Sequence, residues 1–214
     1  MIVDIKHGSR SLAACSKALV GMFDFSIMGY YHQQNPMQLI SSKRELLREF
    51  GSMGIADTVS IQRHIEGCFQ SGIRQEYQQM YIRLACMPRQ QQEGYMERVP
   101  PMSTEFYRLE IVLKMLHRMP SGGISAYDYI RGIYVAYGGH RLGWLTREQR
   151  EAYCIKAMTA IRTDYTNWRD VILAFTIGYA FDKAQEKRVL GYYPPHVHLL
   201  TSRYSLIHNM SLWA

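Results

Sequence analysis

The sequence has few cysteines and no long apolar run, and each absence narrows the class of protein. Its four cysteines, Cys15, Cys68, Cys86 and Cys154, lie far apart and form no CxxC pair, so we expect neither a disulfide framework nor a thiolate metal site. No stretch reaches the roughly 18 apolar residues that a transmembrane helix requires. The segment "SLAAC" follows charged residues instead of the apolar core of a secretory signal. We therefore expect a cytoplasmic protein with reduced thiols.

Basic residues are in excess but are not clustered. The chain has 25 Lys and Arg against 18 Asp and Glu, a net charge of +7, which favours acidic partners. Segments such as "SSKRELLREF" mix both signs, and no basic run carries the interleaved aromatic residues that single-strand binders use. Nucleic-acid binding is therefore only a secondary alternative, and we expect no membrane contact.

Signature motifs of catalysis and metal binding are missing. The sequence contains no GxSxG and no HExxH. The stretch "YGGHRLGW" has Gly138 and Gly139 but lacks the Lys-Ser/Thr step of a phosphate-binding loop, so we interpret it as a helix end. The segment "HVH" offers His196 and His198 where a metal site needs three or four ligands. We expect no metal and no cofactor.

One cysteine has a histidine within reach along a helix. His64 and Cys68 are four residues apart and share a helix face, as a nucleophile and its base could. Cys68 also lies on the apolar stripe of that helix, whereas a reactive thiolate needs electropositive, partly exposed surroundings. We interpret the pair as part of the core.

Helix start and stop signals recur along the chain and predict an all-α fold. We expect a single compact domain of about eight helices, over residues 11–23, 35–51, 56–72, 73–87, 104–119, 125–137, 145–165 and 166–184. Ser103 and Ser125 are the expected caps of two of them, and Thr146 with Gln149 fits a capping box. Residues 89–102 are polar and end in two prolines, which indicates either a linker between subdomains or a surface loop.

The segment "SAYDYIRGIYVAYGGHRLGWL" predicts a helix that is apolar on nearly every side. Such a helix packs on both faces, and it is expected to lie at the centre of the domain. Asp128 and Arg131 are three residues apart in it, close enough to pair. If buried, each needs a partner, because an uncompensated buried charge costs roughly 3–5 kcal/mol. Gly132 beside them leaves room for another element or a ligand.

These residues resemble a bacterial family known as domain of unknown function 1266. The resemblance covers roughly residues 40–182 and rests on steps that the family shows in the same order. The matching positions are Tyr127, Asp128, Arg131, Gly143, Trp144, Leu145, Trp168 and Gly178. Ile73 follows Gly72 where the family usually has a histidine, which is a departure from the pattern. The resemblance implies a compact helical domain and no known reaction. It also implies an association with polymorphic toxin genes, beside which cytoplasmic immunity proteins are encoded.

Three hypotheses on function follow. The first is a protein-binding protein, in one form the immunity partner of a toxin domain with an acidic face. The alternative is a hydrolase or transferase with a pocket around Asp128 and Arg131 beside Trp168, and the second alternative is binding of nucleic acid to a basic surface. The sequence predicts no catalytic residue. It predicts a binding site at Asp128, Arg131, Tyr134, His140, Arg141, Trp144 and Trp168.

Overall fold

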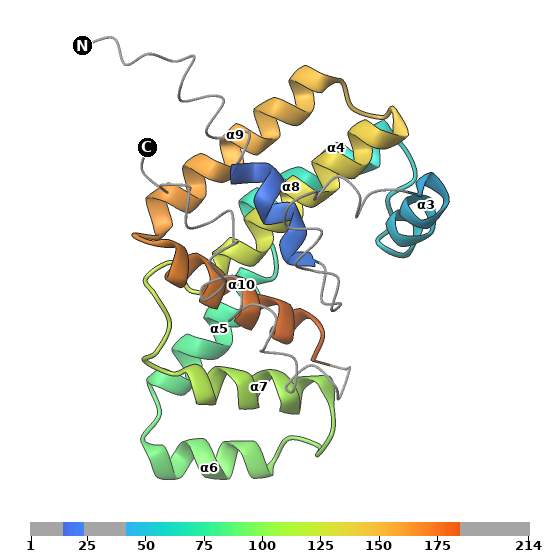
Figure 1. Cartoon of the computed structure of the whole chain (residues 1–214). Coiled ribbons are helices and arrows are strands. Elements are labelled where there is room, and N and C mark those ends of the chain that lie inside the picture. Colours follow the sequence, from blue (N-terminus) through green and yellow to red (C-terminus); the bar gives the residue numbers. More distant parts are fainter. Residues whose placement is uncertain (1–14, 24–41, 185–214) are drawn as a thin grey trace, which may run out of the picture.

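The computed structural model describes residues 15–23 and 42–184, which are entirely helical in their regular structure (Figure 1). This confirms the all-α prediction. Residues 15–20 are helical and lead into the 3₁₀-helix η1 (Gly21–Phe23). Eight α-helices follow: α3 (Lys43–Ser52), α4 (Thr58–Gln70), α5 (Arg74–Ala85), α6 (Arg89–Glu97), α7 (Thr104–Met115), α8 (Ser125–Leu142), α9 (Arg147–Asp164) and α10 (Trp168–Asp182). Among the described residues, no helix has the length and apolar character needed to cross a bilayer.

Side-chain caps fix most helix starts. The box predicted for α9 is present, because Thr146 accepts from the N–H of Gln149 and the Gln149 side chain accepts from the N–H of Thr146. Ser103 caps α7 as predicted. The prediction for Ser125 is wrong, since α8 follows Ile124 and has no side-chain cap. Of the helix expected over 35–51, the structure shows α3, which begins after the extended cap Ser42. Residues 24–41 lie outside the described part.

The segment predicted as a linker or loop, residues 89–102, contains α6 instead. Arginine, glutamine and glutamate, which make up most of this helix, all have good helix propensity. No residue of α6 is buried, so its sequence carries no apolar stripe that would have predicted the helix. The two prolines come after its end, where a helix cannot continue.

Helix α8 lies at the centre of the larger half of the molecule, as predicted. It packs against α9, α4, α10 and α3. All residues of α8 are buried except Arg131 and the last three. Gly138 and Gly139 lie inside this helix and do not end it. Their small size permits close packing, because a Cβ there would come within 2.5 Å of the Phe50 ring and 2.3 Å of Ile61, respectively. The helix ends at Gly143, whose φ of 84° is the left-handed conformation that glycine favours.

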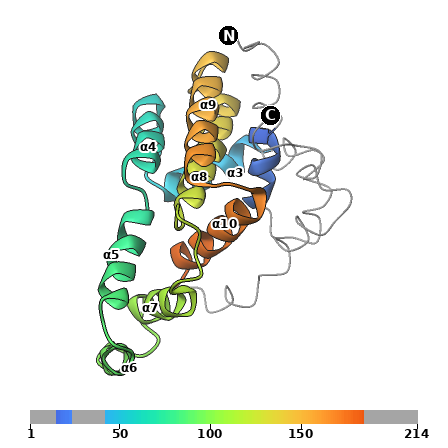
Figure 2. The ribbon, with the colours of Figure 1, turned by 90° about the vertical axis from the view of Figure 1, so that its left-hand side faces the viewer.

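The buried side chains form two clusters that share α10. The larger cluster is built from residues 15–22, α3, α4, α8, α9 and the first part of α10, which includes Phe175. The smaller one joins α5 and α7 to the second part of α10, which includes Phe181. Figures 1 and 2 both show α5, α6 and α7 at one end, with α6 outermost. Gly178 allows α10 to approach α8, since a Cβ there would lie 2.4 Å from the Cβ of Tyr127.

Candidate functional site

Asp128 is buried, as predicted, with 1 % of its surface exposed. Its carboxylate caps another helix: Oδ1 accepts from the N–H of Ile73 at 3.0 Å, and Oδ2 accepts from the N–H of Arg74 at 3.0 Å. These are orphan donors at the start of α5, where a negative charge is also favoured by the helix dipole. Gly72 lies under the carboxylate with φ +55°, and a Cβ there would come within 2.1 Å of Oδ2. Asp128 therefore fixes the turn between α4 and α5.

The ion-pair partner of Asp128 is Arg74, so the prediction that Arg131 would pair with it is wrong. Arg74 Nη1 lies 3.3 Å from Asp128 Oδ2. The same guanidinium donates to the carbonyls of Cys68, at 2.6 Å, and Phe69 at the end of α4, and it stacks over the Tyr129 ring at 5.1 Å. One arginine thus satisfies the last carbonyls of α4 while its carboxylate partner satisfies the first N–H groups of α5.

Arg131 pairs with α10 instead. Its Nη1 lies 3.8 Å from Asp182 Oδ2, and each of these side chains is 22 % exposed. Asp182 also accepts a hydrogen bond of 2.7 Å from the Tyr127 hydroxyl. The spacing along α8 indicated a local pair, whereas each charge has its ion-pair partner on a helix distant in the sequence. The space that Gly132 leaves is filled by Phe69 of α4, whose ring lies 3.3 Å from the position of a Cβ.

Burial dominates the protonation of this region. It raises the pKa of the Asp128 carboxyl, and the N–H groups of Arg74 and Ile73 oppose that shift. It also raises the pKa of the Cys68 thiol to about 12 and lowers the pKa of His64 to about 4, the latter with help from the positive charge of Arg131. Cys68 is therefore a thiol and His64 a neutral imidazole at neutral pH, which agrees with the interpretation of the pair as core.

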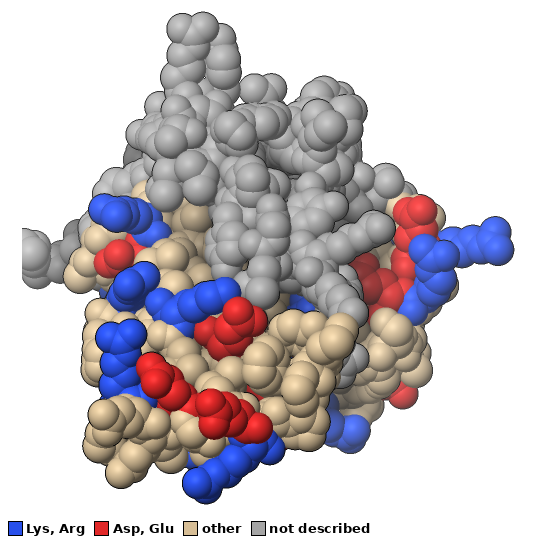
Figure 3. Space-filling model, turned by 90° about the horizontal axis from the view of Figure 1, so that it is seen from below, with Lys and Arg blue, Asp and Glu red and all other residues tan. Residues whose placement is uncertain are grey.

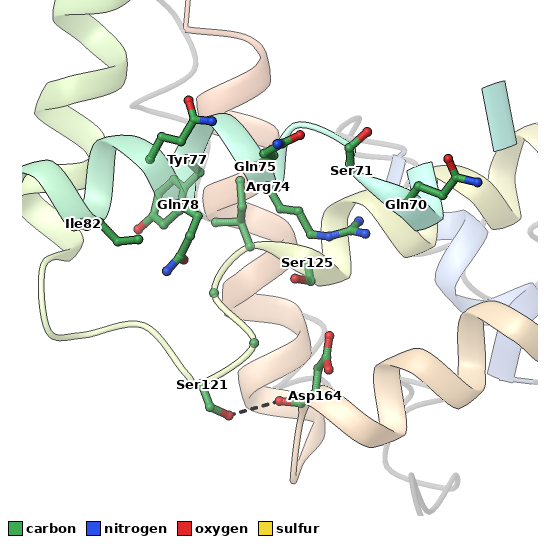
Figure 4. Close-up of a pocket in the computed structure, with 14 residues that line it drawn as sticks. Gln70, Ser71, Arg74, Gln75, Tyr77, Gln78, Ile82, Ser121, Ser125 and Asp164 are labelled. Carbon is green, nitrogen blue, oxygen red and sulfur yellow. Dashed lines mark hydrogen bonds between the residues drawn. The ribbon is translucent and has the colours of Figure 1, made fainter. Parts of the chain in front are cut away.

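A groove of about 790 Å³ opens beside this junction, between α5 and the segment that precedes α8 (Figure 4). We call it the glutamine groove, because amide and hydroxyl side chains make up much of its walls. Its lining includes Gln70, Ser71, Arg74, Gln75, Tyr77, Gln78, Gln79 and Ile82 on one side, and Ser121, Gly122, Gly123, Ile124, Ser125 and Asp164 on the other.

Tyr165 holds the second wall of the groove in place. Its hydroxyl donates toward the carbonyls of Gly122 and Gly123, at 3.1 and 3.2 Å, and accepts from the N–H of Ala126 at 2.9 Å. Gly122 lies against this ring, where a Cβ would come within 2.7 Å of Cζ. The wall is therefore formed before any ligand arrives, which lowers the entropic cost of binding.

Both charged residues of the groove make contacts within the protein, although the Asp164 carboxylate retains acceptor capacity. Arg74 is bound to Asp128 and to the end of α4, and the Asp164 carboxylate accepts from the Tyr129 hydroxyl at 2.9 Å. Tyr77 is 2 % exposed and therefore offers no ring face for stacking, and its hydroxyl has no hydrogen-bond partner. Most of the other groups that the groove offers a ligand are uncharged donors and acceptors, with Ile82, 52 % exposed, as one apolar contact.

The other predicted site residues do not come together. Asp128 and Arg141 are separated by about 20 Å along α8, at 1.5 Å per residue. His140, whose Nδ1 lies 3.0 Å from the Leu145 carbonyl oxygen, and Trp144, packed near Phe50, lie at the same far end of the helix. Trp168 begins α10. Arg131 and Tyr134 line one cavity, where η1, α3, α8 and α10 meet.

The residues of the groove were not predicted as a site, because no recognisable binding motif marks them in the sequence. Gln75, Gln78 and Gln79 look like the solvated face of a helix, and "PSGGIS" looks like an ordinary turn. The glutamine-rich start of α5 and the Gly-Gly turn form a groove only because the fold brings these two segments side by side. The clue available in the sequence was Gly72, which ends one helix directly before another.

Fold and site together define an all-α protein with a preformed groove, lined mainly by amide and hydroxyl side chains, beside a buried ion pair. The chain belongs to the family described as Protein of unknown function (DUF1266), which matches residues 51–212. This confirms the resemblance seen in the sequence. No curated protein and no solved structure matches the chain.

Proposed function

We propose that this protein acts by binding another protein, and that the glutamine groove receives a polypeptide segment of that partner. The observation that carries the proposal is the chemistry of the groove. Amide and hydroxyl groups pair with the N–H and C=O groups of a polypeptide backbone without requiring a charge on it. A volume of about 790 Å³ suits a short polypeptide segment. The wall that Tyr165 holds in place gives this segment a fixed surface to bind.

The alternative of an enzyme receives less support from the same region. The Asp128 carboxylate accepts three hydrogen bonds and is almost fully covered, so a substrate could reach it only by displacing the start of α5. A general base needs to lie within hydrogen-bond reach of the proton it takes. The structural role of Asp128 as a cap accounts for its charge and burial without a reaction.

Nucleic-acid binding also has little support on the face that Figure 3 shows, where basic and acidic residues are interspersed and neither sign covers a continuous area. Several of the charges on the described helices pair with each other, as Lys114 does with Glu110 and Arg108 does with Glu76. Paired charges release few counterions on binding a phosphate backbone.

The role of a cytoplasmic immunity partner in bacteria is one specific form of this proposal. In that form the chain would occlude a toxin domain encoded beside it. Co-expression with the product of the adjacent gene tests this directly: we expect a stable complex on co-purification and rescue of growth. Absence of both would reject the immunity role.

Matched variants test the groove itself. The Gln75→Lys/Gln78→Lys protein replaces two amides of the groove by ammonium groups, which cannot accept a hydrogen bond. We expect it to weaken the complex at least about tenfold, or 1.4 kcal/mol. The control is Gln90→Lys/Gln91→Lys, which adds the same charge on exposed positions of α6. Equal affinity of both variants would place the interface elsewhere on the protein.

A further inference from the structure

A second cavity, of about 610 Å³, lies where η1, α3, α8 and α10 meet, and aromatic rings form much of its wall. The ring of Phe23 lies 4.9 Å from that of Tyr134 and 6.2 Å from that of Tyr127, and the rings of Tyr127 and Tyr179 are 6.3 Å apart. We call this the tyrosine cavity. Its volume is in the range of small-ligand sites, and it shares no lining residue with the glutamine groove.

Two carboxylates line the tyrosine cavity, and each is held by a tyrosine hydroxyl. Tyr134 donates to Glu49 Oε2 at 2.6 Å, and Tyr127 donates to Asp182 Oδ2 at 2.7 Å. Burial, with the negative charge beside each hydroxyl, raises the pKa of both tyrosines, so both remain donors at neutral pH. An ionised carboxylate has about four lone-pair positions, and one hydrogen bond leaves Glu49 with capacity for a ligand.

The charges of the cavity are not all neutralised. Arg131 lies 3.8 Å from Asp182 and compensates that carboxylate. Lys183 also lines the cavity and has an interaction of its own. Within residues 15–23 and 42–184, no ion pair joins Glu49 to a cation. Glu49 is thus a negative charge in a cavity that aromatic rings also line.

We propose that the tyrosine cavity binds an alkylammonium group, which donates a hydrogen bond to Glu49 and lies against the rings of Phe23 and Tyr134. A cation within about 6 Å of a ring centroid is attracted by the negative face of the ring, and a charge-assisted hydrogen bond to a carboxylate is about twice as strong as a neutral one. A primary ammonium fits better than a quaternary one, because only the former has N–H donors for Glu49.

An anion is the less favourable occupant. Arg131 pairs with Asp182, so an anion drawn to Arg131 would be repelled by that carboxylate at short range. The ammonium group could belong to a free amine or to a lysine side chain. The inference does not depend on the glutamine groove, and it can be tested without any protein partner.

The test is an NMR titration of the full chain labelled with ¹³C-tyrosine, in which Tyr127, Tyr134 and Tyr179 are assigned by Tyr→Phe variants. The probes are n-butylammonium chloride, N-acetyl-lysine-N-methylamide and, as the neutral isostere, n-butanol, all at constant ionic strength. We expect saturable shifts of the cavity tyrosines with n-butylammonium and none with n-butanol. Binding of both amines supports a lysine side chain as the natural occupant, and binding of n-butylammonium alone supports a free amine.

Glu49→Gln retains an oxygen that can accept from Tyr134 but removes the charge. We expect its affinity for n-butylammonium to fall about ten- to a hundredfold, the range for a hydrogen bond to a charged group, whereas the matched exposed variant Glu97→Gln binds as the wild type does. Tyr134→Phe keeps the ring and the carboxylate, and we expect no loss of affinity. Equal affinity of Glu49→Gln, equal binding of n-butanol or the absence of saturable shifts would each overturn the proposal.

Discussion

Replacing Asp128 by asparagine is the most informative test of the junction between α4 and α5. The asparagine amide keeps one acceptor oxygen, which can serve the Ile73 N–H. Its NH₂ group then faces the two donors of Arg74, the backbone N–H at 3.0 Å and the guanidinium at 3.3 Å. Both donors lose their acceptor in a region where the Arg74 side chain is only 17 % exposed.

Each unsatisfied buried donor costs about 1–3 kcal/mol. Relief from burying a carboxylate offsets part of this cost, so we expect a loss of about 2–3 kcal/mol in the free energy of unfolding. A chain of this size loses about 2–4 °C of melting temperature per kcal/mol, which gives a decrease of about 4–12 °C.

Urea and thermal denaturation followed by circular dichroism measure both quantities. Glu97→Gln, the same chemical change at an exposed position of α6, is the control and should remain within about 0.5 kcal/mol of the wild type. A value as small for Asp128→Asn would refute the assignment of the carboxylate as the cap of α5.

Three further predictions concern the same framework. Gly72→Ala should destabilise the protein by at least about 2 kcal/mol more than Gly54→Ala, because both glycines have positive φ but only the Cβ at 72 meets another group within 4 Å; equal losses in urea denaturation would contradict this. Burial lowers the pKa of His64 to about 4, so the unfolded chain binds more protons than the folded one between pH 6.5 and 4, and the free energy of unfolding should fall as pH falls through that window. His64→Phe should make the urea midpoint less dependent on pH there. An unchanged dependence of the midpoint on pH would contradict this role of His64. Tyr165→Phe should cost about 1–3 kcal/mol, from the lost hydrogen bonds, and speed hydrogen exchange in the wall it holds; unchanged exchange would mean that the wall does not depend on it.

Local signals in the sequence were enough to predict most of the helices. The structure has the capping box of Thr146 and Gln149, the Ser103 cap and the buried helix at residues 125–137 as expected. Each of these features is encoded by residues close together in the sequence. Helix α6 was not predicted because it buries no residue. A helix that is polar all round leaves no periodic pattern, so its sequence looked like a linker.

The site was harder to predict because its contacts join distant segments. Burial of Asp128 follows from the apolar helix around it, but its partner Arg74 is 54 residues away in sequence. The rule that residues three apart on a helix can pair favoured Arg131, and packing against α10 gave that arginine a different partner, Asp182. Helical periodicity places a side chain on a face and contains no information on which other helix will cover it.

Photo-crosslinking can show whether the glutamine groove holds a segment of a partner protein. A benzoylphenylalanine residue would replace Gln78 in the groove or, in parallel, Gln91 on α6, in cells that also express the product of the adjacent gene. We expect a covalent adduct with that product from position 78 and none from position 91. An adduct from position 91 alone would contradict this expectation.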